Sequence, residues 1–157
     1  MELKTKIIAE DGKQEIFIKR EFNIPLELLF KAYSDPEIVS QWMGTNVLKL
    51  ENIKHGSYQF ETRNKNGDVV FEAHGSIHDI VPEQIIIRTF QMENTPFPAQ
   101  IEFLTFEKIS EDKSKITIQI IYKSVEIRDQ MLKLPFAQGI NLAHNRLEEI
   151  IGPSLLK

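Results

Sequence analysis

The chain has 157 residues, of which 41% are hydrophobic and 27% charged, a size and composition typical of one ordinary folded domain. Its formal net charge of −4 argues against a broad phosphate-binding face, and therefore against nucleic-acid binding. Cysteine is absent, which excludes disulfides, thiolate zinc sites and a cysteine nucleophile.

No apolar run approaches the length needed to span a membrane, and Met1-Glu2-Leu3-Lys4 does not lead into the apolar stretch of a signal peptide. We therefore expect a cytoplasmic protein that is not inserted in a membrane. Linkers, repeats and low-complexity tracts are also missing from the sequence, so a single domain is predicted over residues 1–157.

Most of the sequence up to residue 124 predicts β-structure. Two β-rich runs at the start are separated by Asp11-Gly12, a strong signal for a hairpin turn. Later runs are separated by short turn segments that suit antiparallel neighbours. The candidate strands are 3–9, 14–22, 46–53, 57–63, 69–80, 84–92, 100–109 and 115–123. In the last of these, Ile116, Ile118 and Ile120 alternate with polar residues, which predicts one buried face.

Two short helices are predicted between the second and third β-rich runs. Residues 25–33 follow helical spacing, with a proline near the helix start. The next segment, Ser34-Asp35-Pro36-Glu37, has the pattern of a capping box, in which the serine oxygen caps the following helix. That helix is predicted over 37–43 and should end at Gly44.

Helical spacing returns at the end of the chain. A short helical piece over 126–134 is interrupted by Pro135, and apolar residues from Phe136 to Ile151 then recur at steps of three and four. Gly139 lies inside this stripe, where it costs about 1 kcal/mol relative to alanine. Close backbone packing or the opening of a pocket would account for it.

This order of elements predicts an α+β fold. A curved antiparallel sheet of six or seven strands would wrap around a long C-terminal helix, with two short helices after the first main strand. A strongly curved sheet and a single helix do not pack at full density along their whole length, so we expect a cavity between them.

Several segments are similar to those of a known family at matching spacing. They are Arg20-Glu21-Phe22-Asn23-Ile24-Pro25, Gln41-Trp42-Met43-Gly44, Val81-Pro82-Glu83-Gln84-Ile85, Ser124-Val125-Glu126-Ile127-Arg128 and Arg146-Leu147-Glu148-Glu149. Through them the chain resembles the bacterial activator-of-Hsp90-ATPase-like family of the START-like (helix-grip) superfamily. The resemblance covers nearly the whole chain, with departures at Thr45 and over residues 134–139.

The resemblance implies a START-like domain and a choice of functions. Members of the superfamily bind lipids, hormones, polyketides and other apolar molecules, and some catalyse cyclisation or dehydration. The branch takes its name from a co-chaperone domain. Fold-level analogy is only a prior for function.

Titratable residues give little sign of metal or catalytic chemistry. His74 and His78 are four apart on a predicted strand, about 13 Å, which one zinc ion cannot bridge. The carboxylates form no converging pair, since Glu102 and Glu107 are separated by an odd number of strand positions. We therefore expect no metal, no cofactor and no catalytic residue. His144 could point a polar group into the cavity, although a histidine on the flank of the helix is the commoner case.

Arg88 interrupts an otherwise apolar strand face that contains Phe90. It would hold the anionic head of a ligand or pair with a carboxylate inside the sheet. The commoner alternative is that a bulge or the strand end turns it to water.

The candidate ligand-binding residues are those expected around the cavity. Phe71, Phe90, Phe106, Ile118 and Tyr122 have inward parity, with Trp42, Met131 and Phe136 at the rim, and Arg88 and Ile140 complete the set. The leading interpretation is a non-catalytic binder of a small apolar or amphipathic molecule, monomeric or weakly dimeric. The alternatives are a co-chaperone-like module with a chaperone or other protein partner, and a cyclase- or dehydratase-like enzyme acting on a polyketide-like substrate.

Overall fold

The structure is a computed structural model that describes residues 3–155; the predicted domain also covers residues 1–2 and 156–157, which lie outside the described residues. Strands and helices follow in the order β1 (Lys6–Ile8), β2 (Glu15–Phe22), α1 (Leu26–Ser34), α2 (Pro36–Met43), β3 (Asn46–Leu50), β4 (Ser57–Arg63), β5 (Val69–Val81), β6 (Ile85–Met92), β7 (Gln100–Ser110), β8 (Lys113–Ile121), α3 (Val125–Leu132) and α4 (Phe136–Leu155).

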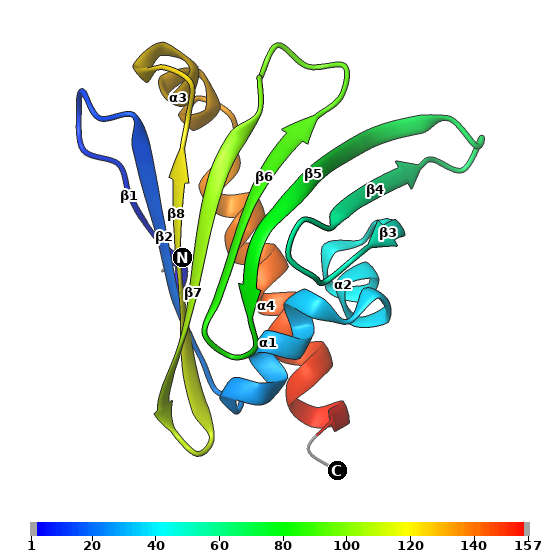
Figure 1. Cartoon of the computed structure of the whole chain (residues 1–157), viewed down its shortest axis with the longest axis vertical. Helices are drawn as coiled ribbons and strands as arrows, with labels where there is room; N and C mark the ends of the chain where they lie inside the picture. Colours follow the sequence, from blue (N-terminus) through cyan, green and yellow to red (C-terminus); the bar gives the residue numbers. More distant parts are fainter. Residues whose placement is uncertain (1–2, 156–157) are drawn as a thin grey trace.

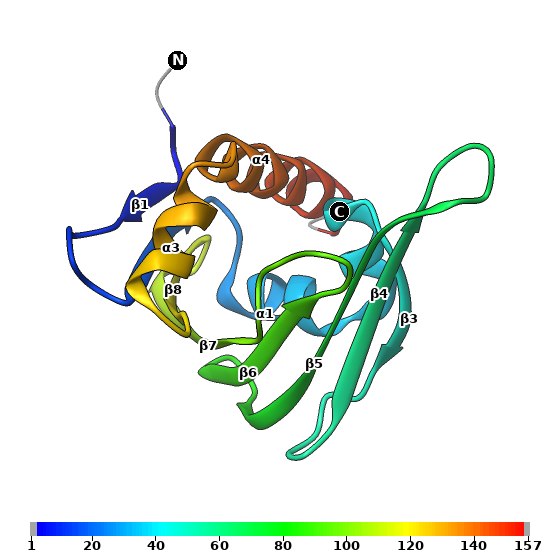
Figure 2. The same cartoon turned by 90° about the horizontal axis from the view of Figure 1, so that it is seen from above.

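The strands form one antiparallel sheet of eight strands in the order β1-β2-β8-β7-β6-β5-β4-β3. The prediction of six or seven strands is therefore wrong, because the short edge strands β1 and β3 both pair with their neighbours. Irregular register in β3, β4, β5 and β7 accompanies the curvature of the sheet. Figure 1 shows α4 crossing behind the sheet, and Figure 2 shows α1 and α4 on its concave side. The predicted α+β class and the curved sheet around a C-terminal helix are confirmed.

The two short helices begin and end close to the predicted residues, but one cap differs. Asp35, rather than Ser34, caps α2, since the Asp35 Oδ1 atom accepts a hydrogen bond from the Glu37 backbone at 3.0 Å. The Ser34 hydroxyl instead donates to the Phe30 carbonyl of α1 at 3.0 Å. The helix ends at Gly44, whose φ of 65° is the left-handed conformation that favours glycine.

Pro135 separates α3 from α4, as the sequence predicts. The first of these helices is capped by Ser124, whose Oγ atom accepts from the Ile127 backbone at 3.1 Å. Helix α3 has eight residues and lies beside the start of α4 (Figure 2).

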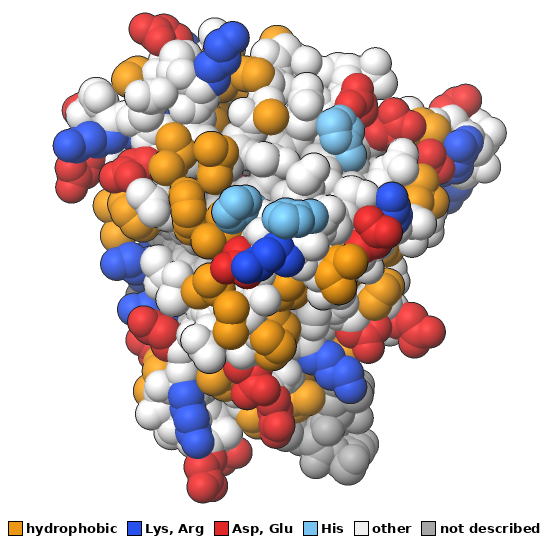
Figure 3. Space-filling view, in the orientation of Figure 1, with side chains coloured by type: hydrophobic (Ala, Val, Ile, Leu, Met, Phe, Trp, Pro, Cys, Tyr) orange, Lys and Arg blue, Asp and Glu red, His pale blue; other side chains and the backbone are white. Residues whose placement is uncertain are grey.

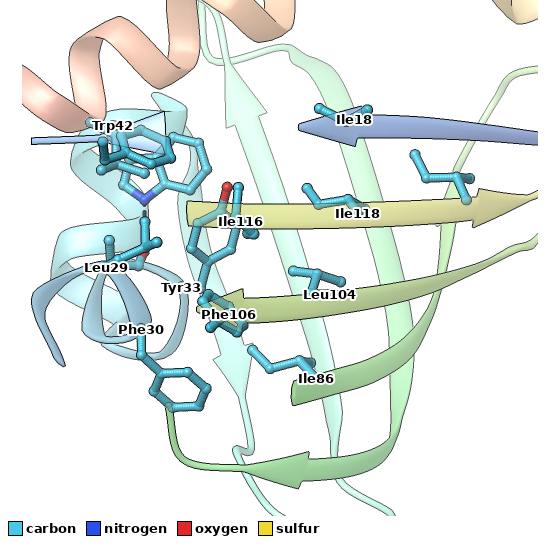
Figure 4. Packing of buried hydrophobic residues seen from close by; sticks show 14 of the residues in the cluster. Ile18, Leu29, Phe30, Tyr33, Trp42, Ile86, Leu104, Phe106, Ile116 and Ile118 are labelled. Carbon is cyan, nitrogen blue, oxygen red and sulfur yellow. Dashed lines mark hydrogen bonds between the residues drawn. The ribbon is translucent and has the colours of Figure 1, made fainter. Parts of the chain in front are cut away.

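The main hydrophobic core lies between the helices and the concave face of the sheet. The predicted alternation in β8 is confirmed, because Ile116, Ile118 and Ile120 are all buried. Figure 4 shows α1 reaching this core with Phe30 and Tyr33. A smaller cluster of Val39, Tyr58, Phe60 and Ile77 fills the space between α2 and the β4–β5 side of the sheet.

Candidate functional site

A cavity of about 310 Å³ lies between α4 and the concave face of the sheet. Its walls are mainly apolar, with side chains from β2, β6, β7, β8 and all four helices. They are Ile18, Tyr33, Trp42, Met43, Arg88, Phe90, Met92, Gln100, Glu102, Ile118, Ile120, Tyr122, Met131, Phe136, Gly139, Ile140, Ala143 and His144.

Most of the residues predicted for the cavity line it in the structure. They are Trp42, Arg88, Phe90, Ile118, Tyr122, Met131, Phe136 and Ile140. Phe136 and Ile140 lie beside the exposed Gly139 in the first turns of α4, which places the opening there. Apart from its chain neighbours and the backbone of α4 itself, no atom of the described residues lies within 4 Å of the position that a Cβ at Gly139 would take, so a pocket opening accounts for this glycine better than close packing.

Phe71 and Phe106 do not line the cavity. Phe106 is buried on β7, but α1 covers it there, with ring centroids 5.0 Å from Phe30 and 5.6 Å from Tyr33. Phe71 lies near the start of β5, where it packs on the smaller cluster instead. Both residues have the predicted inward direction, and the shape of the sheet and the position of α1 remove them from the cavity.

Trp42 is part of the wall rather than the rim, since it is only 3% exposed. Its Nε1–H donates to the Ala32 carbonyl of α1 at 2.7 Å, which fixes the indole against that helix. The Tyr33 ring packs beside it at 5.1 Å between centroids, and Figure 4 shows Tyr33 between the rings of Trp42 and Phe106. Met131 is also buried, so it too belongs to the wall.

A buried ion pair lies in the cavity wall. The Arg88 Nε atom donates to Glu102 Oε1 at 2.9 Å, and Gln100 Nε2 donates to the second carboxylate oxygen at 2.8 Å. The expectation that a bulge or strand end turns Arg88 to water is wrong, because the bulge lies on β5 while Arg88 pairs in register with Glu102. Burial lowers the pKa of Arg88, but Tyr58 and Glu102 outweigh it and hold the pKa above its usual value. Arg88 therefore stays charged.

Tyr122 is the described residue whose hydroxyl is buried without a hydrogen-bond partner. The residue is 3% exposed and follows the end of β8, where its backbone N–H donates to the Gln14 carbonyl at 3.0 Å. Burial, together with the Glu102 carboxylate, raises the pKa of the Tyr122 phenol above its usual range. The hydroxyl therefore keeps its proton at ordinary pH.

His144 joins the cavity to a buried polar network, so its placement on the flank of the helix is wrong. Its Nε2 atom lies 3.2 Å from the Tyr33 hydroxyl, and its Nδ1 atom lies 2.8 Å from Thr5 Oγ1. Burial, followed by the nearby Arg20 cation, lowers the pKa of His144 to about 3. The imidazole is thus neutral at ordinary pH.

Arg20 holds the other end of this network. Its guanidinium donates to Thr5 Oγ1 at 3.1 Å and to Asn145 Oδ1 at 3.0 Å, and Glu148 lies 4.0 Å away. Asn141 Oδ1 accepts from the Thr5 backbone at 3.0 Å. The network therefore connects the segment before β1, strand β2 and helix α4 behind the cavity wall.

Sequence reasoning missed several wall residues. Ile18 and Ile120 share strand parity with residues already predicted and could have been included on that basis. Glu102 has no converging carboxylate by strand parity, and its partner is instead a cation on the neighbouring strand. Tyr33 and His144 carry no sequence signal for their contact, since they are 111 residues apart.

Within residues 3–155 no three metal-binding side chains gather at one point. His74 instead pairs with Glu93 on the exposed face. None of the helices in this part of the chain has both the length and the apolar character required to cross a membrane.

The model of the family described as Activator of Hsp90 ATPase homolog 1-like protein matches residues 23–152. No curated protein matches the chain. The crystal structure of protein Ms6760 from Mycobacterium smegmatis is 17% identical, with a TM-score of 0.83 over 96% of this chain and 98% of that chain.

Two other solved structures are similar to the same extent. A protein from Rhodobacter sphaeroides is 16% identical, with a TM-score of 0.83 over 94% of this chain and 98% of its own. A protein from Arthrobacter aurescens is 13% identical, with a TM-score of 0.82 over 95% of this chain and 92% of its own. At these identities the likeness shows a shared fold alone.

Proposed function

The chain belongs to the family of Activator of Hsp90 ATPase homolog 1-like proteins, and from its interior we propose that it binds a small apolar or amphipathic molecule without transforming it. The observation that carries this proposal is the cavity of about 310 Å³ between sheet and helix. Small-molecule pockets typically measure about 300–1,000 Å³ and are lined by apolar and aromatic side chains with a few polar groups. This cavity matches that description at its lower size limit. We also propose a cytoplasmic location, as expected from the sequence.

Binding is favoured over acid–base catalysis by the state of the polar groups in the wall. A general base must accept a proton near the working pH, and His144, with a pKa of about 3, does so poorly. Both oxygens of Glu102 already accept hydrogen bonds, from Arg88 and Gln100. His144 and Glu102 are therefore engaged in hydrogen bonds that stabilise the cavity wall, and they are poorly suited to proton transfer.

A co-chaperone-like role is the second candidate, since the family description refers to an activator of the Hsp90 ATPase. Leu48, Ile53 and Val70 are exposed hydrophobic residues that a protein partner could cover. Figure 3 shows hydrophobic side chains on the outer face of the sheet in several groups separated by charged side chains and histidines. Stimulation of an Hsp90 ATPase by the purified protein would support this role.

The binding proposal is tested by titration with 2-acetylnaphthalene while the emission of Trp42 is followed. Trp42 is the one tryptophan of the chain and lines the cavity, so we expect a saturable change in emission. Ala143→Phe places a ring in the cavity and should abolish the change. Leu142→Phe, at the exposed neighbouring position of α4, is the matched control and should leave it intact. Binding that survives Ala143→Phe would contradict the proposed site.

Native mass spectrometry of the purified protein provides an independent measurement. A co-purifying small molecule that disappears in the Ala143→Phe variant and persists in Leu142→Phe would support the proposal. A molecule retained by both variants would place its site elsewhere.

A further inference from the structure

The polar groups of the cavity specify the chemistry of its occupant more narrowly than its apolar walls do. The inference that follows rests on the proposed binding function and deepens it. Tyr122 provides its starting point, because a buried hydroxyl without a partner has lost its hydrogen bonds to water and gained none in the protein. A ligand atom that accepts a hydrogen bond would correct this deficit.

The hydroxyl of Tyr33, the other tyrosine that lines the cavity, already has a hydrogen-bond partner. It lies 3.2 Å from His144 Nε2, and the same imidazole contacts Thr5 Oγ1, which accepts from Arg20. The donor that a ligand would engage is therefore the Tyr122 hydroxyl.

Both tyrosines line the cavity and keep their protons at ordinary pH. Burial is the main cause that raises the pKa of each phenol, and the Glu102 carboxylate also raises it. The Tyr122 phenol is thus present as a protonated donor without a partner among the described residues.

The charges in the wall are already balanced. Arg88 and Glu102 are the charged side chains among the described residues that line the cavity, and they pair with each other at 2.9 Å. An anionic ligand would have to compete with Glu102 for Arg88 and would be repelled by that carboxylate. A cationic ligand would have to compete with Arg88 for Glu102 and would be repelled by the Arg88 guanidinium. The interior therefore favours a molecule without net charge.

We propose that the cavity selects an uncharged, largely apolar molecule with one accepting oxygen of the carbonyl class, and that the Tyr122 hydroxyl donates to this oxygen. The occupant is thus distinguished from a fatty acid or another carboxylate, which would bring a charge, and from a pure hydrocarbon, which would leave the Tyr122 hydroxyl without an acceptor.

The experiment compares three probes of similar size by calorimetry: 2-acetylnaphthalene, 2-ethylnaphthalene and 2-naphthoate. In Tyr122→Phe we expect the Kd for 2-acetylnaphthalene to rise roughly tenfold, while that for 2-ethylnaphthalene changes less than about twofold. Tyr58→Phe is the matched control, because Tyr58 is buried outside the cavity and its hydroxyl donates to the Thr89 carbonyl.

Three outcomes are decisive. An equal loss for ketone and hydrocarbon in Tyr122→Phe would overturn the role of the hydroxyl while leaving the binding function intact. Tighter binding of 2-naphthoate than of 2-acetylnaphthalene by the unmodified protein would overturn the preference for an uncharged ligand. Failure of all three probes to bind the unmodified protein would count against the proposed function itself. Unliganded Tyr122→Phe should melt no lower than the unmodified protein, since it removes a hydroxyl without a partner.

Discussion

Arg88 and Glu102 face each other in register on β6 and β7, and their side chains form a buried ion pair in the wall of the cavity. Each residue depends on the other to remain charged without exposure to water. The pair is therefore both a structural contact of the sheet and the feature that leaves the cavity electrically neutral.

Glu102→Gln should separate these two roles. It leaves the Arg88 cation buried without its carboxylate, and we expect a loss of about 3–5 kcal/mol in the free energy of unfolding. The unbalanced cation should also strengthen binding of 2-naphthoate relative to 2-acetylnaphthalene. Chemical denaturation and calorimetry measure the two effects. Glu107→Gln, at an exposed position of the same strand, is the control and should change neither. An unchanged probe preference in Glu102→Gln would show that Arg88 does not face the bound molecule.

Ile118→Phe distinguishes an open cavity from a filled core. Ile118 lines the cavity, so the added ring should enter empty space and hold or raise the melting temperature while it weakens binding of 2-acetylnaphthalene. Leu104, its register partner on β7, is buried outside the cavity. Leu104→Phe should therefore cost about 1–3 kcal/mol by overpacking. Similar destabilisation in both variants would mean that the interior at Ile118 is filled.

The pH dependence of stability should report on His144. The pKa of His144 is about 3 in the folded protein and about 6.5 in an unfolded chain. Below pH 6.5 the unfolded chain therefore binds a proton that the folded protein does not bind. This contribution to stability is complete above that pH and is lost as the pH falls towards 3. Between pH 7.5 and 5 the loss from this residue should be about 2 kcal/mol.

Urea denaturation across this range provides the measurement. His144→Gln should be less stable at pH 7.5 but should decline less steeply on acidification. Asn145→Ala, which removes a hydrogen-bond partner of Arg20 without removing a titratable group, controls for general destabilisation and should decline as steeply as the unmodified protein. Parallel curves for all three proteins would show that His144 does not remain neutral when folded.

Gly139→Ala should stabilise the protein. A Cβ at this position meets no atom of the described residues within 4 Å outside its chain neighbours and the backbone of α4, so the substitution should gain up to about 1 kcal/mol from helix propensity. A thermal melt should rise by a few degrees. Gly75→Ala provides the contrast, since its Cβ would collide with the Thr89 carbonyl and the Tyr58 ring, and it should be strongly destabilising. A lower melting temperature for Gly139→Ala would indicate that another segment fills this opening.

Local patterns in the sequence were sufficient to predict much of the fold. The alternation in β8 gave its buried face, Gly44 gave the end of α2, and Pro135 gave the break before α4, because each of these signals acts within a few residues. The edge strand β1 lies in a β-rich run of the sequence, but whether it joins the sheet depends on pairing across the Asp11-Gly12 turn.

The site could be predicted only in part, because contact between distant residues decides it. Strand parity was enough for Phe90 and Ile118, whereas Phe106 has the same inward direction and is covered by α1. The partner of Arg88 depends on the register between two strands, and a slip of one residue would reverse the faces. His144 is buried by contacts with α1 and with the segment before β1. No local pattern contains that information.

The network behind the cavity has a consequence for how the chain folds during synthesis. Thr5 and His144 are separated by 139 residues, and strand β2 pairs with β8, which lies in the last third of the chain. Closing such long loops is entropically costly before the contacts form, and this slows folding. The inner apolar faces of β2 and α1 therefore remain uncovered until most of the chain has left the ribosome. The emerging polypeptide should need protection from aggregation over that interval.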